Sequence, residues 1–165
     1  MKFLQARGYK VDTLFVDYGQ AAAEKEHSAA KALATTHGCA FEVIRLSGPL
    51  PFGAGELVGR NAFLIFSALF FLRGAPGLLA LGLHSGTTYY DCSESFFTLV
   101  NRLVGEHTDG KVTVLAPFLT WTKRDVYRYF LECGLSLVDT YSCEAGLSAG
   151  CGTCLSCLDR QGLEC

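Results

Sequence analysis

Short apolar runs alternate along the chain with longer stretches in which apolar residues recur at helical spacing. The short runs predict strands at residues 11–17, 40–46, 77–83 and 111–117. The longer stretches predict helices at residues 21–38, 61–73, 93–104 and 122–134. Strands and helices that alternate in this way are typical of an α/β fold, so we expect a doubly wound parallel sheet with helices on both faces.

The predicted helices carry start and stop signals at their ends. Gly38 closes the Ala-rich helix at 21–38, and Thr122 with Asp125 forms a capping-box pattern at the start of the helix at 122–134. The chain opens on the last turns of a further helix that ends at Gly8. A doubly wound domain places a strand and a turn before such a helix. We therefore expect the first strand of the sheet to be missing from this chain.

Polar and aromatic residues gather where the predicted strands end. The segments concerned are DYGQ at 17–20, GRN at 59–61, HSGTTYYDC at 84–92 and APFLTWTK at 116–123. In doubly wound folds, ligands bind at the carboxyl ends of the parallel strands. Each segment alone could be an ordinary polar loop, but four at one edge of a sheet predict a ligand site.

The composition restricts the class of protein. Of the 165 residues, 50% are apolar and 18% are charged, and the net charge is −2, which describes a compact globular domain. The basic residues do not cluster, so we expect no nucleic-acid duplex as a partner. No signal peptide is recognisable, and the apolar run Ala62–Leu72 is too short to span a bilayer. The expected location is the cytoplasm, without a membrane partner, where reduced thiols disfavour disulfides.

Four of the eight cysteines follow the pattern C-x7-C-x2-C-x2-C, and they are Cys143, Cys151, Cys154 and Cys157. Four thiolates suit one tetrahedral zinc ion and leave no position for water, so the predicted zinc is structural. Gly150 and Gly152 allow the tight turn that this spacing needs. An iron–sulfur cluster and a redox pair are the alternatives, but a ferredoxin-type run has a further cysteine where this chain has Gln161. We expect a nucleotide-binding-type α/β region at 1–140 and a zinc-binding C-terminal module of the same domain at 141–165.

These segments together resemble the 7-cyano-7-deazaguanine synthase (QueC) family. The resemblance rests on DYGQ, LVGRNAFLIFSA, YYDCSESFF, APFLTWTK and TYSCEAGLSAGCGTCLSCLDR, which follow one another in the order of that family. It implies a Rossmann-like, adenine-nucleotide α-hydrolase-like fold. It also implies an ATP-using ligase that converts 7-carboxy-7-deazaguanine to the nitrile, with ammonia as the nitrogen source, on the route to queuosine.

The chain departs from the family pattern in four places. The phosphate loop S-G-G-x-D-S is absent, and it would lie on the missing first strand. Ala21 and Ala22 stand where a basic pair usually follows Y-G-Q, and the linker at 46–57 is short. The segment between Gly82 and Asp91 is also shorter than expected and lacks an aspartate. We therefore expect a divergent branch, and a chain that begins at an internal methionine and is inactive in this form.

The resemblance also implies roles for individual residues. Arg60, Tyr90, Asp91 and Phe96 are the expected substrate-binding residues, and Tyr18, Gln20 and Lys123 are the expected contacts to ATP with Mg²⁺. The Asp91 carboxylate suits the N–H donors of a guanine-like edge, and a tyrosine ring suits its face. Phe96 has an alternative role in the core, and Asn61 is expected to cap its helix. No catalytic base is assigned.

Two classes of function remain open from the sequence. The first is the ATP-dependent ligase, with a deazapurine and ATP as small-molecule partners, and a variant of it would join the deazaguanine to a different amine. The second is a zinc-stabilised binding protein for a deazapurine or a protein partner, without ATP-driven catalysis. A homodimer is expected only by analogy with the family.

Overall fold

The computed structural model describes residues 1–46, 48, 52, 55, 57–84 and 86–163, and Cys165 lies outside them. The strands are β1 (Thr13–Asp17), β2 (Phe41–Arg45), β3 (Gly77–Ala80) and β4 (Val112–Leu115). The α-helices are α1 (Lys2–Gln5), α2 (Ala23–Thr36), α3 (Arg60–Phe71), α4 (Glu94–His107), α5 (Lys123–Glu132) and α6 (Leu155–Leu163). Two short 3₁₀ helices, η1 (Tyr90–Cys92) and η2 (Leu137–Asp139), complete the elements of the described residues.

The strands and helices predicted from the hydrophobic pattern are confirmed, with ends shifted by a few residues. The helix end predicted before Gly8 is α1, and Gly8 has a φ of +82°, in the left-handed region that glycine favours. The capping box of α5 is also confirmed: Asp125 accepts the Thr122 N–H at 3.0 Å, and the Thr122 hydroxyl accepts the Asp125 N–H at 3.2 Å. Helix α6 was not predicted.

The strands pair in parallel, as the alternating pattern predicts. Strand β1 pairs with β2, with Thr13 opposite Phe41, and β3 pairs with β4, with Gly77 opposite Val112. Among the described residues these pairs form two separate two-stranded sheets. The α/β class and the parallel pairing are therefore confirmed, whereas a single doubly wound sheet stays a prediction.

The chain forms two compact units. One contains Met1–Gly55 and Tyr129–Cys165, and the other contains Glu56–Arg128. The four cysteines and the DYGQ segment belong to the first unit, and the GRN and YYDC segments belong to the second. The predicted division at residue 140 follows the sequence motifs rather than these units and stays a prediction.

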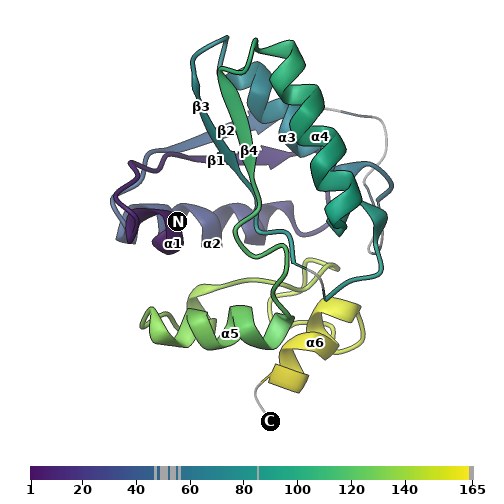
Figure 1. Cartoon of the computed structure of the whole chain (residues 1–165). Coiled ribbons are helices and arrows are strands. Elements are labelled where there is room, and N and C mark those ends of the chain that lie inside the picture. The colour runs from purple at the N-terminus through teal and green to yellow at the C-terminus, as the bar shows by residue number, and fades with distance from the viewer. Residues whose placement is uncertain (47, 49–51, 53–54, 56, 85, 164–165) are drawn as a thin grey trace. The chain divides into compact units, whose positions relative to one another are not determined.

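The core of the second unit lies between one face of the β3–β4 sheet and the helices α3 and α4 (Figure 1). Its buried apolar residues are Ile65, Leu79, Leu83, Phe96, Val100, Val104, Val112 and Val114. They recur at a spacing of four in α4 and of two in β4, as burial of one helix face and one sheet face requires. Helix α3 begins within the GRN segment, and α4 begins shortly after YYDC. Both helices contribute buried residues to this core.

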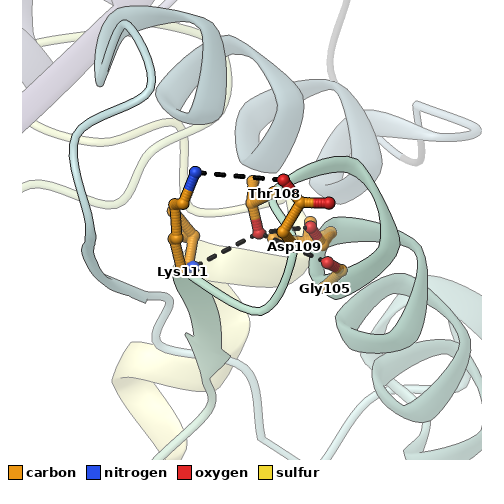
Figure 2. Close-up of polar contacts among 6 residues, drawn as sticks. Gly105, Thr108, Asp109 and Lys111 are labelled. Atoms are coloured by element: carbon orange, nitrogen blue, oxygen red, sulfur yellow. Dashed lines mark hydrogen bonds and ion pairs between the residues drawn. The ribbon is translucent and has the colours of Figure 1, made fainter.

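A tight turn between α4 and β4 closes this unit, as Figure 2 shows. The Thr108 hydroxyl donates to the carbonyl of Val104 at 2.8 Å and accepts the N–H of Val112 at 3.2 Å. The reversal itself uses Asp109 and Gly110, with φ values of +51° and +74°. Because Thr108 satisfies backbone groups on both sides, the turn fixes where β4 begins relative to the end of α4.

The first unit is built around β1, β2 and α2. The His27 ring of α2 packs edge-on against Phe15 of β1 and Phe41 of β2, with ring centroids 5.5 and 5.3 Å apart. Ala34 of α2 is fully buried. None of the described helices has the length and apolarity that crossing a membrane would require.

Candidate functional site

The four cysteines predicted to bind metal come together in the structure. The Sγ atoms of Cys143, Cys151, Cys154 and Cys157 all lie within 4.8 Å of one another. The Sγ atoms of Cys151 and Cys157 are 3.9 Å apart. A tetrahedron with metal–sulfur bonds of about 2.3 Å places its sulfurs about 3.8 Å apart, so the cluster has the size of a four-thiolate metal site. It can hold one metal ion.

Backbone donors point at the sulfurs and favour the thiolate form. The Cys151 sulfur accepts the N–H of Cys154 at 3.2 Å and both the N–H and the hydroxyl of Thr153 at 3.5 Å. The Thr153 hydroxyl, together with these N–H groups, lowers the pKa of the Cys151 thiol to about 6. Gly150 and Gly152 adopt φ values of +76° and +72°, which confirms their predicted role in the turn. A thiolate is the ligand form of cysteine, so these donors favour cation binding at Cys151. At Cys157 the Gly152 N–H is outweighed by the hydrogen bond with Cys154 and by burial, which raise the pKa of that thiol to about 11.

Glu144 links the cysteine cluster to two other segments of its unit. One carboxylate oxygen accepts the N–H and the hydroxyl of Ser156, at 3.2 and 2.7 Å, in the first turn of α6. The other oxygen accepts the N–H of Gly55 at 3.0 Å. A carboxylate at a helix N-terminus is favourable because it faces the positive end of the helix dipole. The sequence analysis missed Glu144, although its place directly after Cys143 was a signal.

The cluster also contacts the segment that follows DYGQ. A Cβ atom added to Gly146 would lie 2.3 Å from the carbonyl oxygen of Ala21, so the two backbones approach closely. Ala22 is 2% exposed. The alanines that replace a basic pair of the resembled family thus lie under the loop between Cys143 and Cys151. A small side chain at 22 fits this close packing, whereas Ala21 is exposed and contributes its backbone carbonyl.

The DYGQ loop is shaped by its own side chains. The Gln20 side-chain oxygen accepts the N–H of Tyr18 at 3.0 Å, and its amide nitrogen donates to Glu26 at 3.0 Å. Asp17 accepts the N–H of Gly19, whose φ is +88°. Gln20 therefore stabilises the turn, and the Tyr18 ring packs edge-on against Phe52 with centroids 5.7 Å apart. An ATP contact by Tyr18 or Gln20 stays a prediction.

The GRN and YYDC segments meet at the start of α3. One Asp91 carboxylate oxygen, Oδ2, accepts the N–H of Asn61 at 3.1 Å. The Asn61 side-chain amide donates to the carbonyl of Asp91 at 3.0 Å and to the Cys92 sulfur at 3.6 Å. The expectation that Asn61 caps α3 is wrong, because Gly59 occupies the cap position, with a φ of +80°. Asn61 instead faces the η1 turn.

The other expected substrate residues lie around the same turn. Tyr90 is 60% exposed, whereas Phe96 is 8% exposed and belongs to the core, with the two ring centroids 6.0 Å apart. Phe96 therefore takes the core role that the sequence left open, and stacking by the exposed Tyr90 stays a prediction. Arg60 begins α3, directly before Asn61. Lys123 begins α5, and its backbone lies near Gly86. The Gly86 N–H donates to the His84 ring at 3.0 Å.

Comparison with known proteins adds a family to this geometry. The family model described as "Queuosine biosynthesis protein QueC" matches residues 56–164, which is more than half of the chain. This chain belongs to the QueC family. The QueC match contains both the Asn61–Asp91 contact and all four clustered cysteines, whereas DYGQ lies outside it.

Similar proteins from archaea extend over most of the chain. Proteins named 7-cyano-7-deazaguanine synthase from Halobacterium salinarum and Methanothermobacter thermautotrophicus are each 29% identical over 93% of this chain. The matched region covers 79% and 82% of those proteins. A protein of the same name from Haloarcula marismortui is 28% identical over 94% of this chain and 80% of its own length. The named relatives of this QueC-family chain are thus synthases.

Proposed function

We propose that this chain is part of an ATP-dependent carbon–nitrogen ligase that acts on the carboxylate of 7-carboxy-7-deazaguanine, on a queuosine-type pathway. The observation that carries the proposal is the collinear match to synthases of that name, which runs through the Asn61–Asp91 contact and the four cysteines. In the resembled reaction ATP activates the carboxylate, and ammonia displaces the activated oxygen to give an amide. A second ATP activates the amide oxygen, which leaves bound to AMP or phosphate while the nitrogen loses its protons, so that the net change is loss of water and the product is the nitrile.

The side chains around η1 suit recognition of a deazaguanine. Oδ2 of Asp91 is held by the N–H of Asn61, and Oδ1 has the weak thiol donor of Cys92 at 3.8 Å. A charged oxygen with so weak a partner can accept a stronger N–H donor from a guanine-like edge. Tyr90 is exposed beside it and can cover the face of the ring. Arg60 offers a cation to the substrate carboxylate or to a phosphate.

The metal that we propose for the four cysteines is a structural zinc ion. Four sulfur ligands saturate tetrahedral zinc, and the backbone N–H groups around Cys151 stabilise its thiolate. Such an ion would hold the 143–157 loop closed, and Glu144 would connect the loop to α6 and to Gly55. We assign it no chemical step.

We propose that the two parallel sheets belong to one doubly wound sheet completed by a further strand. Each pair, β1–β2 and β3–β4, is a two-stranded sheet, and isolated two-stranded sheets are marginally stable. In the resembled family the first strand carries S-G-G-x-D-S, which this sequence lacks. A strand of that kind would pair with a free edge and bring backbone N–H groups to the phosphates of ATP.

The second candidate is a zinc-stabilised QueC-like protein that binds a deazapurine or a protein partner without ATP-driven catalysis. A variant of the ligase would instead join the deazaguanine to an amine other than ammonia. The observation that favours the second candidate is the Ala21–Ala22 pair, which packs beneath Gly146 where the family pattern has basic residues. A site without those charges neutralises less of a polyphosphate. The amine and the ATP requirement therefore distinguish the two candidates.

Binding of 7-carboxy-7-deazaguanine, measured by calorimetry, tests the proposed function. The parent chain should bind it, and Asp91→Asn should bind at least about tenfold more weakly, because a neutral amide replaces a charged acceptor. Asn at position 91 keeps an oxygen for the Asn61 N–H, so the melting temperature should change little. No binding by the parent, or equal affinity in the variant, would contradict the proposed substrate site.

A further inference from the structure

Among the described residues, Asn61 is the polar residue that is buried, with 4% of its surface exposed. A polar group is costly to bury unless its hydrogen bonds are satisfied. Asn61 meets this condition by contacts to one short segment, η1, which lies 30 residues away in the sequence. The arrangement indicates a specific task at this position, since an apolar residue would fill the same space without the need for partners.

Asn61 donates three hydrogen bonds to η1, one from its backbone and two from its side chain. The Asn61 backbone N–H donates to Oδ2 of Asp91 at 3.1 Å, and the Asn61 side-chain amide donates to the Asp91 carbonyl at 3.0 Å. A third bond reaches the Cys92 sulfur at 3.6 Å. Together these three bonds, here called the Asn61 clamp, hold both the main chain and the carboxylate of Asp91. The position of that carboxylate is therefore determined by α3.

The start of α3 is a favourable place for this carboxylate. The first N–H groups of a helix have no partner within the helix, and the positive end of its dipole attracts an anion. Asp91 supplies that anion from outside the helix, so its charge occupies the N-terminus of α3. With Oδ2 committed, only Oδ1 remains to meet a ligand, and its thiol partner is weak.

Further hydrogen bonds hold η1 at its downstream end. Ser93 caps α4 by accepting the N–H of Phe96 at 3.1 Å, and the N–H groups of Cys92 and Ser93 close the turn onto Tyr89 and Tyr90. These bonds connect η1 to α4 but do not orient the Asp91 side chain. The Asn61 clamp is what connects the turn to α3.

We propose that Asn61 is a positioning residue for substrate recognition, which fixes Asp91 so that Oδ1 faces the N–H donors of the deazaguanine. This rests on the proposed function, because it takes Asp91 as the group that meets the substrate. Asn61 itself touches neither substrate nor reacting atoms. Its amide acts through the Asp91 carbonyl and the Cys92 sulfur.

The test compares Asn61→Ala with Asn101→Ala. Asn101 is a matched control, because it also uses its side chain to connect a helix to another element, accepting the N–H of Val114 at 2.9 Å. Both variants should lower the melting temperature. Only Asn61→Ala should weaken binding of 7-carboxy-7-deazaguanine, by about ten- to a hundredfold, since the Asp91 carbonyl loses its partner and the turn is released. Asn61→Ser, whose short hydroxyl cannot reach both partners, replaces Asn61→Ala if that variant does not fold.

Amide hydrogen exchange supplies a second readout that needs no ligand. In Asn61→Ala, exchange at Cys92 and Ser93 should be faster by about tenfold, whereas Asn101→Ala and Asp91→Asn should leave it near that of the parent. Unchanged affinity in Asn61→Ala, or an equal loss in Asn101→Ala, would overturn the inference. If the parent fails to bind the deazaguanine, the proposed function fails and the positioning role fails with it. In that case the exchange rates still show whether the clamp orders η1, and unchanged rates would reject the clamp itself.

Discussion

At the scale of single residues, the presence or absence of a side chain at certain positions determines how two backbone segments contact each other. Asn61 and Gly146 are the two clearest. Asn61 provides donors that hold η1, and Gly146 lacks a side chain where the chain must pass the carbonyl of Ala21. We assign neither residue a ligand, yet each holds a segment that the sequence connects with function.

Gly146→Ala should destabilise the protein by about 2 kcal/mol or more, because alanine disfavours positive φ and its Cβ would collide with backbone. Gly146 has a φ of +74°, and the added Cβ would lie 2.3 Å from the Ala21 oxygen. Denaturant unfolding measures the change. Gly162→Ala is the matched control, since Gly162 lies in α6 with open space around its missing Cβ, and it should be neutral or stabilising. Equal midpoints for the two variants would show that the loop does not pack on Ala21.

At the scale of elements, α6 and the cysteine loop depend on one another. Cys154 lies directly before α6, and Cys157 lies in its first turn. Glu144, next to Cys143, accepts the Ser156 N–H at the start of the helix. Metal ligands and helix start are therefore shared by the same short segment. Since metal binding free energy is also folding free energy in such a segment, the metal should order α6.

We expect one zinc ion per chain by elemental analysis, and Cys154→Ala should lose it and expose residues 143–163 to rapid hydrogen exchange. The reason is that three sulfurs bind zinc far more weakly than four, and α6 then loses its anchor. Cys133→Ala is the control, because Cys133 lies outside the cluster, and it should retain the metal. Iron with sulfide in place of zinc, or protection of α6 without any metal, would contradict this prediction.

The cap of α5 should give a defined pH dependence. Hydrogen bonds from the hydroxyl and the N–H of Thr122 lower the pKa of Asp125 below its ordinary value of 3.8. The carboxylate is thus favoured in the folded state, and its contribution to stability is present above about pH 4 and lost as the pH falls through the lowered value. The stability difference between the parent and Asp125→Ala should be constant near neutral pH and shrink in acid. A difference that persists undiminished at about pH 2 would contradict this account of the cap.

At the scale of the whole chain, local patterns predicted local structure well. Apolar periodicity located four strands and four helices, and Thr122 with Asp125 and Gly38 located helix ends, because these depend on neighbours in sequence. The cysteine spacing likewise located the four-cysteine cluster, which can hold one metal ion. Helix α6 was missed because its apolar residues are few and because two of the four clustered cysteines lie at its start. The Asn61 clamp was missed because it joins residues 30 positions apart, and no local rule connects an asparagine in a helix to a distant aspartate.

The last prediction concerns ATP. We expect the 165-residue chain to bind ATP weakly and to turn over no substrate, because a triphosphate needs several aimed donors. In the DYGQ loop the Gln20 side chain already bonds the N–H of Tyr18 and the carboxylate of Glu26, and Arg60 and Lys123 supply single cations. A form extended at its N-terminus by a strand and an S-G-G-x-D-S loop should bind ATP and form product from 7-carboxy-7-deazaguanine and ammonia.

The control is the same extension with alanines at the two glycines and the aspartate of the loop, which adds the strand without the phosphate donors. It should gain stability from the strand and remain inactive. Turnover by the 165-residue chain, or by the alanine-substituted extension, would show that the phosphates are held elsewhere and that the proposed nucleotide site is wrong.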